Sequence, residues 1–164
     1  MKIRPLTVAL GAEISGVDLS VEQTPEAIAE IAAAWERYAV LVLHDQRLSV
    51  ADQLRFTRSF GEIQGKRADG ERKGQQYMIV GTRPVDGVPG EIGDGELMFH
   101  QDGCYTPTPS DKSFLYALEI PATGGNTLFA STARAYARLP ADLRQQLLGY
   151  DIRFTFDPTH YTRT

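Results

Sequence analysis

The residues best suited to chemistry are His100 and Asp102, which are separated by one glutamine. The run from Leu97 to Tyr105 is predicted to be a strand, in which residues i and i+2 point to the same face. An imidazole nitrogen and a carboxylate oxygen would then face one ion. Such a pair supplies two of the three ligands in the 2-His-1-carboxylate arrangement, which holds Fe(II) and leaves positions open for substrate and oxygen.

The spacing alone is a weak signal, because a histidine at a strand edge more commonly bonds a neighbouring carboxylate. The chain holds two other histidines. His44 follows an apolar run and is interpreted as a residue at a strand end. His160 is interpreted as a solvated loop residue, with a metal ligand as the less favoured alternative. Cys104 is expected to be a small buried side chain and not a reactive thiol.

Composition limits the class of protein. The 164 residues fit one domain of ordinary size, so residues 1–164 are predicted to form a single domain. The chain is 42% hydrophobic and 23% charged, which predicts a packed core and not a disordered chain. A formal net charge of −4 argues against non-specific nucleic-acid binding. The absence of a long apolar run or a disulfide framework predicts a cytoplasmic protein with no membrane partner.

Four helices are predicted from their start signals. Thr24 and Pro25 are typical of a helix N-terminus, and apolar residues at helical spacing follow them. Residues 49–52 resemble a capping box that begins a second helix, which Gly61 is expected to end. Ser131 is expected to cap a third helix, and the fourth is predicted over 140–148.

Strands are predicted at several apolar or alternating runs, and glycine-rich stretches between them are predicted to be mobile loops. The run 39–43 is apolar on both faces, which favours a central strand. The mobile loops are predicted over 62–75 and 81–96. The other predicted strands are 2–9, 77–80, 97–105, 113–119, 127–130 and, with weaker alternation, 150–156.

Several sequence blocks resemble, in the same order, the taurine dioxygenase family of Fe(II)/2-oxoglutarate-dependent oxygenases, which also contains the 2,4-dichlorophenoxyacetate dioxygenases. Together the blocks are far more specific than any one of them, and the resemblance covers nearly all of residues 5–150. The blocks are Gly11-Ala-Glu-Ile-Ser-Gly-Val-Asp-Leu19, Val42-Leu-His-Asp-Gln46, Arg58-Ser-Phe-Gly61, His100-x-Asp102 and Pro121-Ala-Thr-Gly-Gly-Asn-Thr127.

The resemblance implies that His100 and Asp102 are two iron ligands and that Thr127 bonds the carboxylate of 2-oxoglutarate. It implies a mixed α/β fold with a double-stranded β-helix (jelly-roll) core and external helices. The implied function is an Fe(II)- and 2-oxoglutarate-dependent dioxygenase that uses O2 to hydroxylate a small organic acid and releases succinate. The stretch 93–98 departs from the taurine enzyme, which speaks against taurine as substrate. Relatives commonly form dimers or tetramers, so a homo-oligomer is expected.

The family also has a second histidine and a carboxylate-binding arginine, both well over a hundred residues beyond its His-x-Asp pair. The jelly roll needs about eight strands, and the run from Leu97 onward supplies too few. We therefore expect an incomplete oxygenase domain that is inactive by itself. Two alternatives stay open: a non-catalytic β-rich binding domain or enzyme relic, and a zinc hydrolase that uses His100 and Asp102 with a water.

Overall fold

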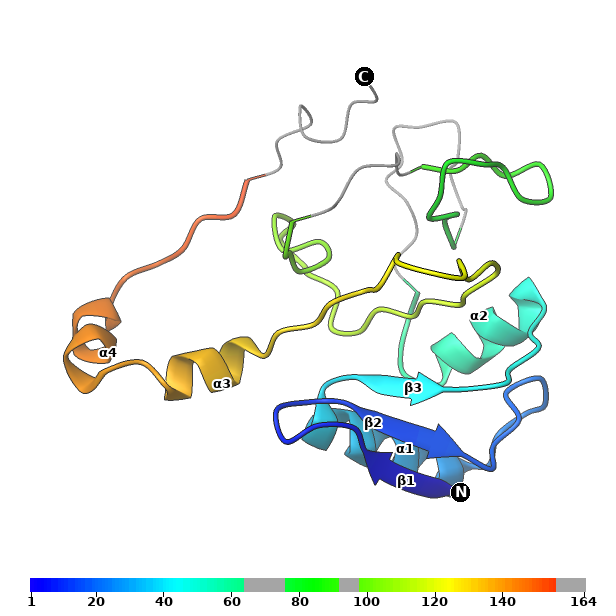
Figure 1. Ribbon diagram of the computed structural model, residues 1–164, viewed down its shortest axis with the longest axis horizontal. Coiled ribbons are helices and arrows are strands. Elements are labelled where there is room, and N and C mark those ends of the chain that lie inside the picture. Colours follow the sequence, from blue (N-terminus) through cyan, green and yellow to red (C-terminus); the bar gives the residue numbers. More distant parts are fainter. Residues whose placement is uncertain (64–75, 92–97, 156–164) are drawn as a thin grey trace. The chain divides into compact units, whose positions relative to one another are not determined.

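The computed structural model describes residues 1–63, 76–91 and 98–155. The chain forms two compact units, of which the first comprises residues 1–62 and 115–150 and the second residues 63–114 and 151–164. Within the described ranges, all helices and strands belong to the first unit, which is mixed α/β as predicted. In chain order they are β1 (Lys2–Pro5), β2 (Ala12–Ser15), α1 (Pro25–Tyr38), β3 (Leu41–Leu43), α2 (Val50–Arg58), α3 (Thr132–Ala137) and α4 (Ala141–Leu147) (Figure 1).

The strands form one three-stranded sheet in the order β1-β2-β3. β2 pairs antiparallel with β1 and parallel with β3, so β2 is the central strand. The predicted strand 2–9 ends at Pro5, because Thr7 turns the chain: its hydroxyl accepts from the Leu10 N–H (3.0 Å) and donates to the Leu10 carbonyl (2.6 Å). The prediction that 39–43 forms a central strand was wrong for the described part of the chain. There, β3 is an outer strand of the sheet and is half-buried.

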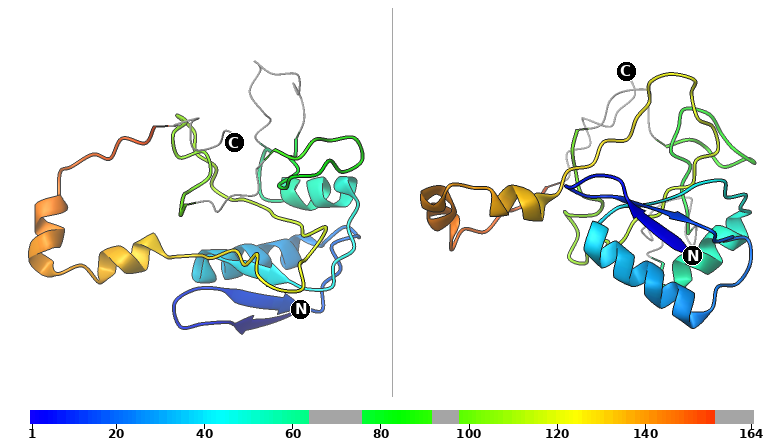
Figure 2. Two further views of the ribbon diagram at one scale, coloured as in Figure 1. Left: turned by 45° about the horizontal axis from the view of Figure 1, so that its top comes forward. Right: turned by 60° about the horizontal axis from the view of Figure 1, so that its bottom comes forward.

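Helix α1 begins where the sequence predicted. The Thr24 hydroxyl accepts a hydrogen bond from the Ala27 N–H at 3.2 Å, and Pro25 occupies a position whose N–H would have no helical partner. The helix lies along the sheet (Figure 2). Its inward face adds Ile31 and Ala34 to a small core, whose buried side chains are Ala12, Ile14, Leu19, Ile31, Ala34 and Phe56.

We expect Ile31→Ala to lower the free energy of unfolding by about 2–5 kcal/mol, the usual cost of truncating a buried aliphatic side chain. Ile31 is only 1% exposed. Ile28→Ala on the same helix is the matched control, because Ile28 is half-buried and its truncation should cost less. Chemical denaturation measures both values, and equal losses would contradict the placement of Ile31 at the centre of the core.

Helix α2 begins with the predicted capping box. The Ser49 hydroxyl accepts from the Asp52 N–H (3.2 Å), and the Asp52 carboxylate accepts from the Ser49 N–H (3.0 Å) and hydroxyl (2.6 Å). Arg55 also donates to this carboxylate at 2.7 Å. The Ser49 hydroxyl, followed by Arg55, lowers the pKa of Asp52 to about 2. The helix ends at Arg58, three residues before the predicted Gly61.

Acid should weaken this cap. Because folding lowers the pKa of Asp52 from its ordinary 3.8, the ionised carboxylate stabilises the folded chain above about pH 4, and this contribution is lost as the pH falls toward 2. The free energy of unfolding should therefore fall less steeply between pH 4 and pH 2 in Asp52→Asn than in the wild type. Ser49→Ala, which removes the largest cause of the shift, should give an intermediate slope. Identical slopes in all three proteins would contradict the role of the cap.

The connection between β3 and α2 is held by Gln46 and Tyr116. The Gln46 side chain accepts from the Leu19 N–H (2.9 Å) and donates to the Val17 carbonyl (3.0 Å). The Tyr116 hydroxyl accepts from the Leu48 N–H (3.0 Å) and donates to the Gln46 carbonyl (3.2 Å). Through these bonds, residues 17–19 and Tyr116 both contact the turn at residues 46–48, although they are distant from it in sequence.

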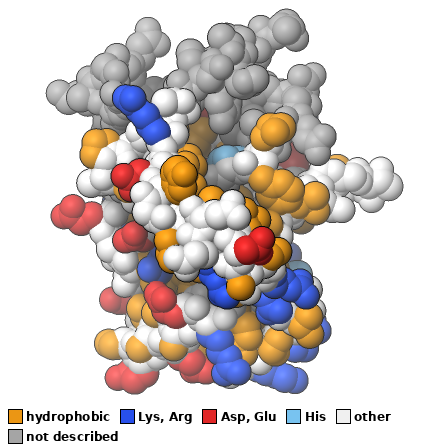
Figure 3. Space-filling view, turned by 90° about the vertical axis from the view of Figure 1, so that its left-hand side faces the viewer, with side chains coloured by type: hydrophobic (Ala, Val, Ile, Leu, Met, Phe, Trp, Pro, Cys, Tyr) orange, Lys and Arg blue, Asp and Glu red, His pale blue; other side chains and the backbone are white. Residues whose placement is uncertain are grey.

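The remaining predicted strands are not formed in the described part of the chain. Residues 113–119, 127–130 and 150–155 carry no strand, and 77–80 contributes only an isolated bridge between Ile79 and Gly90. A strand needs a neighbour for its backbone hydrogen bonds, and the described ranges provide none for these segments. Their apolar side chains are accordingly exposed, as in Leu115 at 70% and Leu128 at 66%. Figure 3 shows such hydrophobic side chains on the face that it draws.

Helices α3 and α4 agree with prediction. Ser131 caps α3 by accepting a hydrogen bond from the Arg134 N–H at 3.2 Å. Helix α4 ends before Gly149, whose φ of 86° suits a residue without a side chain. Its apolar residues Leu143 and Leu147 share a face that is exposed. In the described part of the chain, none of the helices is long and apolar enough to cross a membrane.

Candidate metal centre

The second unit holds His100 and Asp102 in a turn. The Cys104 N–H donates to the Gln101 carbonyl at 3.3 Å, and Gly103, with a φ of 66°, supplies the left-handed backbone of the turn. The strand predicted over 97–105 was therefore wrong for its described part, 98–105, because this stretch forms turn bonds and no ladder. Position 97 lies outside the described residues.

The two side chains nevertheless meet. His100 Nε2 lies 3.2 Å from Asp102 Oδ1, and the side chains are 44% and 56% exposed. The turn brings them to one side of the chain, which the sequence analysis expected from strand geometry. Both side chains are in contact with solvent.

A backbone contact fixes the imidazole. His100 Nδ1 lies 2.8 Å from the Met98 carbonyl oxygen. A carbonyl oxygen only accepts hydrogen bonds, so Nδ1 carries the hydrogen and the neutral ring keeps its free lone pair on Nε2. Nε2 lies 3.2 Å from Asp102 Oδ1, which is also an electron-pair donor. The two atoms therefore suit a shared cation, either a proton on the ring or a metal ion between them.

The separation of the two atoms fits a metal ion. Adjacent ligand atoms in an octahedral site with bonds of about 2.1 Å are about 3 Å apart, close to the observed 3.2 Å. One imidazole and one carboxylate also match part of the donor set that non-haem Fe(II) sites use. The separation of His100 and Asp102 is therefore compatible with two neighbouring ligand positions of such an ion.

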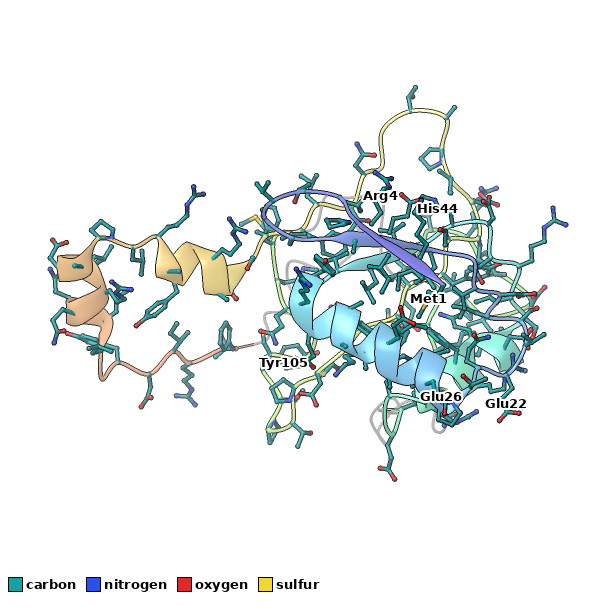
Figure 4. All side chains as sticks on the ribbon, turned by 90° about the horizontal axis from the view of Figure 1, so that it is seen from below. Met1, Arg4, Glu22, Glu26, His44 and Tyr105 are labelled. Atoms are coloured by element: carbon teal, nitrogen blue, oxygen red, sulfur yellow. The ribbon has the colours of Figure 1, made fainter. Side chains whose placement is uncertain are left out.

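No third ligand joins them in the part of the chain that the structure describes, where no group of three or more His, Cys, Asp or Glu side chains could hold a metal. His44, labelled in Figure 4, follows β3 in the first unit and is exposed. His160 lies outside the described residues, as do 64–75 and 92–97, which make up most of the predicted mobile loops. The described residues 85–88 of those loops form a tight turn at Asp86 and Gly87.

Thr127, the expected 2-oxoglutarate contact, belongs to the first unit and is exposed. It follows Gly124 and Gly125, whose φ values of 75° and 67° are typical of a tight turn. That Thr127 lies within reach of the His100–Asp102 pair stays a prediction. Cys104, expected to be buried, is half-buried and carries a free thiol.

Ser113, which the sequence predicted only as the start of a strand, contacts Asp102. Its hydroxyl lies 2.6 Å from Asp102 Oδ2. An ionised carboxylate only accepts, so the hydroxyl donates this bond. Eleven residues separate the two positions, and no sequence pattern signals a contact at that distance.

A hollow of about 260 Å³ lies elsewhere, in the first unit. Its charged lining residues are Arg134 and Arg138, and the others are Ala9, Leu10, Phe129, Ala130, Ser131 and Ala135. Arg134 donates to the Val8 carbonyl, which ties α3 to the turn between β1 and β2. The hollow contains no carboxylate or imidazole, so it offers no metal ligands.

Comparison with known proteins gives a consistent result. Residues 2–164 match the model of the family described as taurine catabolism dioxygenase TauD, TfdA family. An (S)-phenoxypropionate/alpha-ketoglutarate-dioxygenase from Sphingobium herbicidovorans is 28% identical, over 99% of this chain and 55% of that protein. A pentalenolactone F synthase from Streptomyces arenae is 31% identical, over 93% and 53%.

Solved structures agree with the sequence matches. A taurine dioxygenase from Burkholderia xenovorans is 30% identical and superposes with a TM-score of 0.69, covering 90% of this chain and 51% of that one. The chain therefore spans about half the length of the relatives that it matches.

Proposed function

Because this chain belongs to the taurine catabolism dioxygenase TauD, TfdA family, we propose that the full-length protein is an Fe(II)- and 2-oxoglutarate-dependent dioxygenase. The observation that carries this proposal is the approach of His100 Nε2 and Asp102 Oδ1 to 3.2 Å, with His100 Nδ1 in contact with the Met98 carbonyl. We also propose that the full-length protein has a jelly-roll core, part of which lies outside these 164 residues, and that it forms a homo-oligomer.

In this proposal, His100 and Asp102 hold the iron. The hydrogen bond from Nδ1 to the Met98 carbonyl keeps Nε2 available as a ligand, and the carboxylate offsets one positive charge of the ion. Thr127 donates its hydroxyl hydrogen to a carboxylate of 2-oxoglutarate. When bound, Fe(II) with 2-oxoglutarate supplies the activation of O2, coupled to decarboxylation of 2-oxoglutarate to succinate, that hydroxylates an unactivated carbon.

The proposed substrate is a small organic acid. The names of related proteins include a phenoxypropionate dioxygenase and an alpha-ketoglutarate-dependent sulfate ester dioxygenase from Pseudomonas putida. Both names describe compounds with an anionic group on a small organic skeleton. We include taurine in the test as the expected poor substrate, because the sequence at 93–98 departs from that of the taurine enzyme.

The test is succinate formation by the full-length protein with Fe(II), 2-oxoglutarate and O2. Aryloxyalkanoic acids, alkyl sulfates and taurine are added singly, and each product is identified by mass spectrometry. We expect one of the first two classes to raise succinate formation and to take up one oxygen atom, which is found either in a hydroxylated product or in the carbonyl fragment that an unstable hydroxylated product releases. Failure of every compound to do so, together with no 2-oxoglutarate consumption, would favour the alternative of a non-catalytic binding domain or enzyme relic.

A further inference from the structure

The Asp102 carboxylate makes two contacts through different oxygens. Oδ1 faces His100 Nε2 at 3.2 Å, and Oδ2 accepts from the Ser113 hydroxyl at 2.6 Å. The second distance lies within the range of about 2.5–2.7 Å that is usual for a hydroxyl that donates to a charged oxygen. Each oxygen therefore has a separate partner, and the carboxylate is held in one orientation.

This orientation would otherwise be free. The terminal torsion of an aspartate side chain has a broad, roughly two-fold profile, and Asp102 is 56% exposed, so water competes for both oxygens. A donor on Oδ2 prevents the group from rotating and leaves Oδ1 directed at the imidazole. It also withdraws Oδ2 from the ion, which favours binding through one oxygen.

The loop between the two residues is built to bring Ser113 back. The Thr106 N–H donates to the Gly103 carbonyl at 2.9 Å, and the Thr106 hydroxyl contacts the same carbonyl at 2.8 Å. This turn closes directly after Asp102, so the chain returns and Ser113 reaches the carboxylate. Ser113 itself is exposed.

We infer that Ser113 is a positioning residue, whose hydroxyl orients the Asp102 carboxylate for metal binding beside His100. This inference rests on the proposed function for the identity of the metal, but the carboxylate orientation can be measured with another divalent ion. Groups that support a metal ligand typically change metal affinity by about 10–100-fold when removed.

The experiment measures Co(II) binding by the full-length protein, using the visible absorption of the bound ion. We expect Ser113→Ala to weaken binding by about tenfold or more and to alter the spectrum. Ser113→Thr retains the hydroxyl and should restore both to near the wild-type values. Ser59→Ala is the matched control, because Ser59 is exposed at the end of α2 in the first unit, and it should bind as the wild type does.

Three outcomes would overturn the inference: unchanged affinity in Ser113→Ala, a Thr variant as weak as the Ala variant, or no Co(II) binding by the wild type. Thermal unfolding of each variant separates a positioning effect from a loss of folding. If the wild type binds Co(II) and Ser113→Ala weakens it, but no compound supports succinate formation, the proposed function fails and the role of Ser113 stands.

Discussion

Replacing His100 or Asp102 with alanine in the full-length protein should abolish succinate formation and weaken Fe(II) binding by more than about hundredfold. Loss of a group that merely supports a ligand costs about 10–100-fold, and loss of the ligand itself removes a bond to the ion. The donor atoms, His100 Nε2 and Asp102 Oδ1, lie 3.2 Å apart. Anaerobic Fe(II) titration and a succinate assay measure the two effects. Because ligands must be deprotonated, binding should also weaken as the pH falls.

The matched controls are His44→Ala and Asp111→Ala. His44 is an exposed histidine after β3, and Asp111 is an exposed aspartate in the second unit. Each control substitution therefore removes the same kind of side chain as one of the test substitutions, but at a position outside the pair. Both should keep wild-type affinity and turnover. Turnover that survives in either His100→Ala or Asp102→Ala would remove the pair from the catalytic machinery.

Thr127→Val should raise the concentration of 2-oxoglutarate that gives half-maximal turnover by about 10- to 100-fold, with Fe(II) binding largely intact. The substitution keeps the shape of the side chain but removes a hydrogen bond to a charged group, which contributes about 1.5–3 kcal/mol. Thr127 is exposed after the turn at Gly124 and Gly125, so the change should not disturb a packed core. The measurement is succinate formation against 2-oxoglutarate concentration.

Thr123→Val is the control for this prediction, since it makes the same change in an exposed residue four positions earlier. It should leave the 2-oxoglutarate requirement unchanged. If the two variants behave alike, Thr127 has a structural role and another residue binds the cosubstrate.

The helices could be predicted because their signals are local. The Thr24 hydroxyl accepts from the Ala27 N–H and the Ser49 hydroxyl from the Asp52 N–H, so the donor and acceptor of each cap lie three residues apart, and both caps form. The end of α2 was less predictable, since the helix stops at Arg58 while the sequence signal was Gly61. A glycine permits a helix to end but does not require the preceding turn to stay helical.

The strands could not be predicted in the same way, because a strand depends on a partner that is distant in sequence. The apolar run 127–130 has the composition of a strand but lacks a ladder in the described part of the chain. The short β2 at 12–15 forms because β1 and β3 lie on its two sides. The family resemblance was recognisable from ordered blocks, one of which ends in Gln46, whose side chain ties the turn after β3 to the Leu19 backbone.

For the site, the sequence predicted that the side chains of His100 and Asp102 lie together, and they do, but in a turn and not on a strand. His100 and Asp102 meet across a turn, which places side chains at i and i+2 together as a strand face does. Ser113 could not be predicted, because its contact depends on the closure of the intervening loop. The roles of His100, Asp102 and Thr127 in binding iron and 2-oxoglutarate stay predictions.

The most direct test of the account is a visible absorption spectrum of the full-length protein under argon, with Fe(II) and 2-oxoglutarate. Chelation of Fe(II) by the keto acid produces a charge-transfer band, which Zn(II) cannot produce because it has no accessible redox state. We predict that the band appears with the wild type, is absent with Zn(II), and is lost in His100→Ala and Asp102→Ala. A wild-type protein that binds Fe(II) without this band, or an equal band in His100→Ala, would contradict the assignment of an iron and 2-oxoglutarate site to this pair.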